Sequence, residues 1–299
     1  MQSDVALSFW ISFGAAAVAS YPVLVLLRRL RAESIISRYA PEAHQSKQGT
    51  PSMGGIITLF GCLVAFIAMP ARGTADGIGT VVWLLFAFAF VGLLDDLVVP
   101  RLTGKRGIGW MPKLALQLVA VSPLFFSLPV ADAAGVAFWV LFFANAVNFA
   151  DGLDGLAASL LLLTLPVLAL LLGWSAESAI ALAVCGGLLP FLFLNAPPAR
   201  LFMGDVGALS FGATYGYLFA HAEWQRSVAP WALSLVFILE LVLVPIQIVA
   251  VKTIGRRVFP ATPIHHAFEV RGWPESRVVW TFLLAQVALS ALVLTGVLS

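Results

Sequence analysis

Long apolar runs recur along the whole 299-residue chain, and they constrain its fold more than any other feature of the sequence. Each run is about 20 residues long, the length that a helix needs to cross the hydrocarbon core of a bilayer. Only helices and closed barrels satisfy all backbone polar groups in lipid. With 61% hydrophobic residues and a mean hydropathy of +0.97, the chain is predicted to be an all-α, polytopic helical membrane protein.

Ten runs are predicted to be transmembrane helices, over residues 6–27, 54–70, 78–94, 112–130, 134–149, 155–173, 178–194, 206–222, 228–254 and 277–298. No Pro/Ser-rich linker, low-complexity tract or repeat separates them, so we expect one membrane domain over residues 1–299. The ninth run is unusually long and contains Glu240 and Pro245. A proline inside a helix removes a backbone hydrogen bond, so a broken or strongly bent helix is expected there.

Lysine and arginine are distributed unevenly among the connecting loops. Fifteen of the 17 basic residues fall after the first, third, fifth, seventh and ninth runs, and only Arg72 and Arg226 fall elsewhere. Cytoplasmic loops carry this excess, so these loops are predicted to be cytoplasmic and both termini to lie outside. Arginines follow the first run and none precedes it, the reverse of a cleavable signal peptide, so we expect this run to be a retained helix.

The cysteines and the net charge say little about partners. Cys62 and Cys185 lie inside apolar runs, where they are expected to be small packing residues without a disulfide framework. The net charge is +2, and the predicted membrane topology already explains where the basic residues lie. Nucleic-acid binding gains no support from either feature.

Acidic residues gather where apolar runs end on the predicted cytoplasmic side. Asp95 and Asp96 follow the third run, at the C-terminal end of the expected helix. The helix dipole disfavours negative charge at that end, so a metal ion or a lysine is expected nearby. The alternative is a solvated helix end, and for an adjacent acidic pair alone the two interpretations are about equally favoured.

Two further segments combine acids with glycines. In the segment from Asn148 to Gly155, Asp151 and Asp154 are three residues apart, so on the first turn of a helix they would share a face. An N-cap and turn explains either acid alone but explains the whole group poorly. Asp205 can cap the helix expected to begin near residue 206, whose backbone donors would suit an anion.

The remaining polar candidates each have a structural alternative. Spacing alone favours Phe202 as a membrane-interface aromatic over a platform for a planar base. Lys47, beside His44 in the loop before the second run, is a topology signal or a partner for phosphate. Adjacent His265 and His266 point apart and no cysteine joins them, so zinc is not expected; hydrogen bonding to phosphate or sugar is favoured over a purely structural loop.

An aspartate-rich cluster without cysteine suits a hard cation such as Mg²⁺, which is usually held by one or two carboxylates and by substrate phosphates. The residues therefore predict a metal-dependent enzyme acting on an anionic substrate at the cytosol–membrane boundary. An ion-coupled transporter or a lipid-binding scaffold is the alternative of another class. Transport would predict functional acids along the bilayer depth, including Glu240, whereas every other candidate acid lies at one face.

Along nearly its whole length the chain resembles the polyprenyl-phosphate N-acetylhexosamine-1-phosphate transferase superfamily, and most closely its phospho-N-acetylmuramoyl-pentapeptide transferase family. The resemblance is carried, in order, by HQSKQGTPSMGG (44–55), GLLDD (92–96), NAVNFADGLDGLA (145–157), PARLFMGDVG (198–207) and PIHHAFEVRGWPE (263–275). The last segment is the one most specific to the family, because the UDP-GlcNAc branch differs there.

The resemblance implies Mg²⁺-dependent transfer of phospho-MurNAc-pentapeptide from its UDP carrier to undecaprenyl phosphate, giving lipid I and UMP for peptidoglycan synthesis. The runner-up is GlcNAc-1-phosphate transfer from UDP-GlcNAc to the same lipid. The implied location is the bacterial cytoplasmic (inner) membrane, with the active site on the cytoplasmic face. The oligomeric state is left open, with a homodimer as one candidate.

The family motifs also assign roles to individual residues. The implied metal ligand is Asp205, and the implied acidic pair at the lipid phosphate is Asp95 and Asp96, with Asp95 deprotonating that phosphate. Lys113 matches a family lysine near the pyrophosphate. The implied donor-site residues are Lys47, Asn148, Asp151 and Asp154 at the nucleotide, Phe202 on uracil, and His265 and His266 at phosphate or sugar.

The chain departs from the family pattern at two places. Ala267 stands where the family has a third histidine, and Leu97, Val98 and Val99 replace a stretch that usually holds a lysine. The loss of one imidazole and one cation could reduce activity, change the accepted sugar substituent or indicate another role. The five retained aspartates argue against an inactive enzyme.

Overall fold

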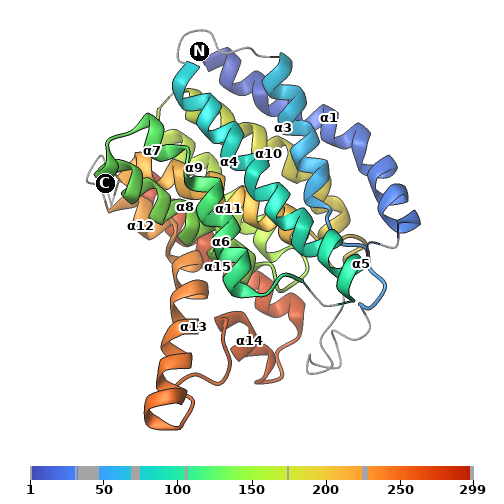
Figure 1. Ribbon diagram of the computed structural model, residues 1–299, viewed down its shortest axis with the longest axis vertical. Coiled ribbons are helices and arrows are strands. Elements are labelled where there is room, and N and C mark those ends of the chain that lie inside the picture. Colours follow the sequence, from blue (N-terminus) through green and yellow to red (C-terminus); the bar gives the residue numbers. More distant parts are fainter. Residues whose placement is uncertain are drawn as a thin grey trace.

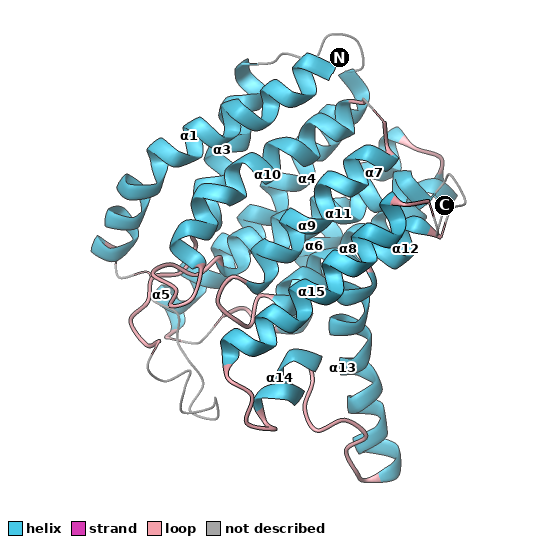
Figure 2. Cartoon of the chain, turned by 180° about the vertical axis from the view of Figure 1, so that it is seen from behind, coloured by secondary structure: helices cyan, strands magenta, loops and turns pink. Residues whose placement is uncertain are grey.

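The computed structural model describes residues 2–30, 32, 47–68, 75–104, 107–173, 175–223 and 228–296, and their regular secondary structure is helical (Figure 1). Seen from behind in Figure 2, the same bundle consists of helices joined by loops. The predicted all-α class is confirmed. His44, Arg72, Lys105, Arg106 and Arg226 lie outside the described residues.

Ten helices correspond to the ten predicted runs, although several begin or end a few residues away. They are α1 (Gln2–Arg29), α3 (Gly55–Ala68), α4 (Ala75–Leu93), α6 (Trp110–Val121), α8 (Val130–Ala150), α9 (Leu156–Leu171), α10 (Ala176–Asn195), α11 (Gly204–Glu223), α13 (Leu235–Ile254) and α15 (Glu275–Leu294). Short segments complete the description: the π-helical η1 (Leu94–Val98), α5 (Val99–Thr103), α7 (Leu124–Ser127), α12 (Ala229–Leu233) and α14 (Ile264–Glu269).

Seven helical segments of the described chain are long and apolar enough to cross a membrane: Asp4–Arg29, Gly79–Thr103, Trp110–Ser127, Val130–Ala150, Ala176–Asn195, Leu235–Ile254 and Glu275–Leu294. The apolar helices α3 and α9 are shorter, with 14 and 16 residues. Helix α11 has 20 residues but interrupts its apolar sequence with Gly, Ser, Thr and Tyr. The chain is therefore a polytopic membrane protein, and ten crossings remain a prediction.

The ninth run is broken, as expected, but the break is not at the proline. It divides at Ser234, whose ψ of 1° separates α12 from α13. Helix α13 then continues through Pro245, so Pro245 does not end it. Figure 1 shows α13 leaving the bundle at an angle and extending beyond it, beside α14. The predicted position of the break was wrong, because Ser234 and not Pro245 adopts the non-helical backbone conformation.

Helix α11 forms the centre of the bundle, between α8, α4 and α3. Every residue from Val206 to Ala220 is buried. Glycines bring its backbone close to α8: a Cβ at Gly212 would lie 2.4 Å from the Phe143 carbonyl oxygen, and one at Gly216 would lie 2.3 Å from that of Trp139. Small residues permit such close approach of helices where lipid gives no hydrophobic drive for association.

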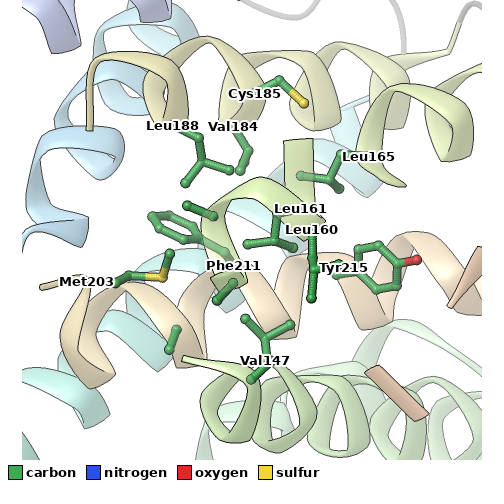
Figure 3. Packing of buried hydrophobic residues seen from close by; sticks show 14 of the residues in the cluster. Val147, Leu160, Leu161, Leu165, Val184, Cys185, Leu188, Met203, Phe211 and Tyr215 are labelled. Atoms are coloured by element: carbon green, nitrogen blue, oxygen red, sulfur yellow. The ribbon is translucent and has the colours of Figure 1, made fainter. Parts of the chain in front are cut away.

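Apolar side chains from α8, α9, α10 and α11 interlock around this centre (Figure 3). In the figure Phe211 and Tyr215 of α11 lie among Leu160 and Leu161 of α9 and Leu188 of α10. The predicted packing role of the cysteines is confirmed, because both Cys62 and Cys185 are buried free thiols. The core thus fixes the helices whose ends carry the polar motifs.

Both chain termini lie at the same end of the helices in Figure 1, and α5 lies at the other. This arrangement is the one that an even number of helical passes would produce. The side of the membrane that each end faces remains the prediction made from the basic residues.

Candidate active site

The helix that carries Asp95 and Asp96 does not end at these residues, contrary to the prediction. Helix α4 continues as the π-helical turn η1 and then as α5, which ends at Thr103. The unfavourable helix terminus therefore lies beyond the acids. Single-turn π segments often mark functional sites, because they change the direction in which side chains point.

A lysine lies close to the acids and offsets their negative charge, as expected. Lys113, near the start of α6, forms an ion pair with Asp205, and its Nζ lies 3.5 Å from Oδ2 of Asp95. Asn148 of α8 donates from Nδ2 to Oδ1 of Asp205 at 2.7 Å. Four elements therefore converge on the Asp205 carboxylate, which lies in the first turn of α11 rather than at its cap.

Backbone donors hold the acidic pair. Asp95 Oδ1 accepts a hydrogen bond from the N–H of Ile108 at 2.7 Å, and Asp96 Oδ2 accepts one from the N–H of Val206 at 3.2 Å. One carboxylate oxygen from each of Asp95, Asp96 and Asp205 lies within 4.8 Å of the others. Three hard oxygen ligands at this spacing could hold a divalent cation.

Asp151 and Asp154 do not share a helix face, contrary to the prediction. Asp151 has a ψ of 41° and Gly155 has a φ of +75°, so residues 151–155 form a turn between α8 and α9. The two side chains consequently serve different parts of the site. Burial, followed by the charges of Asp205, Asp96 and Asp154, raises the pKa of the Asp151 carboxyl well above its usual range.

Asp154 belongs to a second charged cluster. Its Oδ1 lies 2.6 Å from Lys47 Nζ, and its Oδ2 accepts a hydrogen bond from the N–H of Ala199 at 2.8 Å. Lys47 also contacts Glu275 Oε1 at 2.6 Å. Lys47 is therefore more than a topology signal, because two carboxylates from distant segments hold its ammonium group.

A cavity of about 350 Å³ connects the two clusters. Its lining includes Asp96 and Asp205 of the first cluster and Lys47 and Asp154 of the second; Ser52, Asn148, Asp151, Gly152, Leu153, Asn195, Phe202 and Gly204 complete it. Phe202 thus faces a polar cavity instead of acting only as an interface aromatic. Its backbone pairs with the segment before α3, accepting from Gly54 N–H at 2.8 Å and donating to Pro51 O at 2.9 Å.

The two histidines of α14 lie in different environments. His265 is fully buried, and its Nδ1 lies 3.0 Å from Oε2 of the buried Glu240. Its Nε2 has no hydrogen-bond partner among the described residues. A Cβ added at Gly152, which lines the cavity, would lie 2.4 Å from this nitrogen. His266 is 35% exposed and contacts Glu269 Oε2 at 2.6 Å. A contact of either histidine with phosphate or sugar stays a prediction.

Sequence reasoning assigned no role in this site to four residues: Ser52 and Asn195, which line the cavity, and Glu240 and Glu275, which contact His265 and Lys47. Asn195 links the turn to the next loop, accepting from Gly155 N–H at 3.1 Å and donating to Leu201 O at 3.0 Å. Glu240 carried a signal, since a carboxylate within an apolar run demands a partner. Glu275 carried a weaker one, as an acid at the start of an apolar helix.

The chain matches known sequences over nearly its full length. A family model for glycosyl transferase family 4 matches residues 78–222, and the phospho-N-acetylmuramoyl-pentapeptide-transferase signature 1 matches residues 47–57. The transferase of that name from Desulforamulus reducens is 35% identical, over 96% of this chain and 93% of its own length. This chain belongs to the phospho-N-acetylmuramoyl-pentapeptide-transferase family. The proteins of that name from Moorella thermoacetica and Oceanobacillus iheyensis are 36% and 33% identical, over 87% and 88% of this chain.

The structure shows where the chain departs from the pattern of this transferase family. Ala267 is buried at 5% exposure within α14, so a third histidine there would need neighbouring side chains to move. Val98 and Val99 lie at the junction of η1 and α5, close to the acidic pair. Among the described residues, Lys113 is the cation that pairs with Asp95, and it also pairs with Asp205.

Proposed function

We propose that this protein transfers phospho-MurNAc-pentapeptide from UDP-MurNAc-pentapeptide to undecaprenyl phosphate, forming lipid I and UMP. The observation that carries the proposal is the full-length likeness to transferases of that name, together with the match to their signature at Lys47–Ile57. The site would face the cytoplasm of a bacterial inner membrane, because the loops that carry it are those rich in basic residues.

The two clusters around the cavity suit the two substrates. Asp95, Asp96 and Lys113 would receive the lipid phosphate, and the Lys47–Asp154 end would receive the nucleotide, with Phe202 beneath its planar base. Both substrates carry negative phosphate, so their approach requires positioning and charge neutralisation more than covalent help from the protein. Lys113 supplies one positive charge at the meeting point.

The chemistry can be assigned to atoms of this chain. Asp95 would take the proton from the lipid phosphate, and a phosphate oxygen would then bond to the sugar-bearing phosphorus of the donor. The bond from that phosphorus to the bridging oxygen breaks, and UMP leaves with the electron pair. The Ile108 N–H donates to one oxygen of Asp95, so the other, 3.5 Å from Lys113, would be the one that accepts the proton.

Mg²⁺ fits the acidic group, because the carboxylate oxygens of Asp95, Asp96 and Asp205 are hard ligands within 4.8 Å of one another. When bound, it would supply charge neutralisation to the phosphates. Asp205 remains the principal proposed ligand, and Asn148 orients its carboxylate through Oδ1.

Release of UMP tests the proposal directly. The detergent-solubilised protein should release UMP from UDP-MurNAc-pentapeptide when undecaprenyl phosphate and Mg²⁺ are both present, and EDTA should stop the reaction. Asp205→Ala should abolish turnover in a protein that still elutes as a folded species. No release by the unsubstituted protein would count decisively against the assignment.

UDP-GlcNAc should be assayed in parallel, because turnover of that donor alone would favour the other branch of the superfamily. The transporter alternative is less well supported. Glu240, the candidate acid within the membrane span, is buried in contact with His265. In contrast, four of the five aspartates line the cavity, and Asp95 lies beside two of them, Asp96 and Asp205.

A further inference from the structure

Glu275 is a carboxylate at the cavity edge to which the proposed reaction assigns no role. It is the first residue of α15, and its side chain is 21% exposed. One oxygen, Oε1, accepts from Lys47 Nζ at 2.6 Å and from the N–H of Asp154 at 2.7 Å. This single oxygen therefore joins three segments: the one before α3, the turn before α9 and the start of α15.

These contacts restrict Lys47. An ammonium group has three N–H donors, and two of them are directed at Glu275 and Asp154, both at 2.6 Å. The lysine side chain is only 17% exposed and lines the cavity. Two carboxylates from different elements thus fix the direction of the third donor, which remains to bind a ligand atom.

Glu275 restricts the turn as well. Asp154 is held at its N–H by Glu275 and at its carboxylate by Lys47 and the N–H of Ala199. A free lysine side chain loses rotamer entropy when it is immobilised. Contacts that order it before the ligand arrives remove that cost from binding.

We infer that Glu275 is a positioning residue for the donor nucleotide, acting by orienting Lys47 and the Asp154 turn. The inference rests on the proposed function, because it specifies how one end of that site is kept ready. Glu275 is assigned no contact with a reacting atom, so its loss should weaken donor binding without slowing the chemical step.

Glu275→Gln tests this role, since glutamine can still accept from the Asp154 N–H but no longer carries the charge that holds Lys47. Losing one charge-assisted hydrogen bond should raise the donor KM about tenfold. The value of kcat should stay within about twofold, and the KM for undecaprenyl phosphate should not change. Glu177→Gln, in the first turn of α10 at the opposite end of the bundle, is the matched control and should match the unsubstituted protein.

A second measurement asks whether Glu275 acts through Lys47. The affinity for uridine 5′-diphosphate is measured by calorimetry for Glu275→Gln, Lys47→Met and the double variant. Glu275→Gln should weaken binding about tenfold in the unsubstituted background and by less than about twofold once Lys47 is gone, because coupled residues are not additive. If the two substitutions weaken diphosphate binding additively, the inference is overturned. It is also overturned if Glu275→Gln leaves the donor KM unchanged, or if it lowers kcat and raises both KM values by the same factor.

Failure of the inference can be separated from failure of the proposed function. If the unsubstituted protein binds the diphosphate but releases no UMP, the reaction is wrong and the binding cycle still decides the role of Glu275. If turnover is normal and Glu275→Gln behaves like the control, only the role of Glu275 is wrong. Absence of diphosphate binding to the unsubstituted protein would overturn both.

Discussion

At the scale of single residues, the site consists of charges that require partners. The carboxylates of Asp95, Asp96 and Asp205 lie close together, and the ammonium group of Lys113 pairs with Asp95 and Asp205 and so reduces their mutual repulsion. Removing one partner of a buried ion pair costs far more than the pair itself contributes. Lys113 should consequently be needed for folding stability as well as for turnover.

Lys113→Met should destabilise the metal-free protein by about 3 kcal/mol, because among the described residues Lys113 is the cation that contacts these acids. Mg²⁺ should restore much of this loss, since a divalent ion can neutralise the same carboxylates. Thermal unfolding in detergent, measured with Mg²⁺ and with EDTA, checks both effects. The exposed Lys252→Met serves as control. Equal stabilisation by Mg²⁺ in both variants would contradict the shared site.

Asp151 should make metal-free stability depend on pH. Its pKa is raised in the folded protein, chiefly by burial, so the folded state binds this proton more tightly than the unfolded state. This contribution is complete below the unfolded pKa of about 3.9 and is lost as pH rises through the folded pKa. Asp151→Asn should flatten the decline in unfolding temperature above about pH 4, measured in EDTA. The exposed Asp132→Asn should leave the slope unchanged.

At the scale of elements, the positions of helix ends decide the site. Helix α4 meets the start of α11 at Gly92, where a Cβ would lie 2.3 Å from the backbone of Asp205 and Val206. That contact lets Asp96 reach the Val206 N–H. The geometry of the acidic group is thus set by how closely these two helices approach.

Gly92→Ala should force these helices apart, because the clashing atoms belong to the backbone. We expect a loss of about 1–3 kcal/mol, as for other overpacked sites, and a larger proportional loss of turnover. Gly79→Ala is a control in the same helix, since no atom of the described residues lies within 4 Å of a Cβ there. Unfolding temperature and UMP release are measured for both, and equal behaviour would show that the contact is not critical.

The sequence predicts the elements well and their mutual contacts poorly. Apolar runs locate the helices, and the five aspartates are conspicuous because so few charges occur in this chain. The Lys47–Glu275 pair could not be predicted, since its members are 228 residues apart and meet only through tertiary packing. The turn at Asp151 and the break at Ser234 were misplaced because local backbone angles, and not residue spacing, determine them.

At the scale of the whole molecule, the basic residues predict which end of the bundle faces the cytoplasm. Both cysteines are buried, so the unsubstituted protein should react little with impermeant thiol reagents. Thr295→Cys, near the end of α15, should be labelled in intact spheroplasts, whereas Arg256→Cys, after α13, should be labelled only in inverted vesicles. Both side chains are exposed. The opposite pattern would reverse the topology and place the cavity outside the cell.

Helix α11 carries Asp205 yet is buried at every position from Val206 to Ala220, enclosed by other helices. A bilayer that thickens or thins acts on the outer surface of a protein, where helices tilt to match it. The helix bearing the central carboxylate is shielded from that force by its neighbours. The enzyme should therefore keep the same catalytic rate constant when it is reconstituted in lipids of different acyl-chain length, as in a cell that remodels its membrane with temperature.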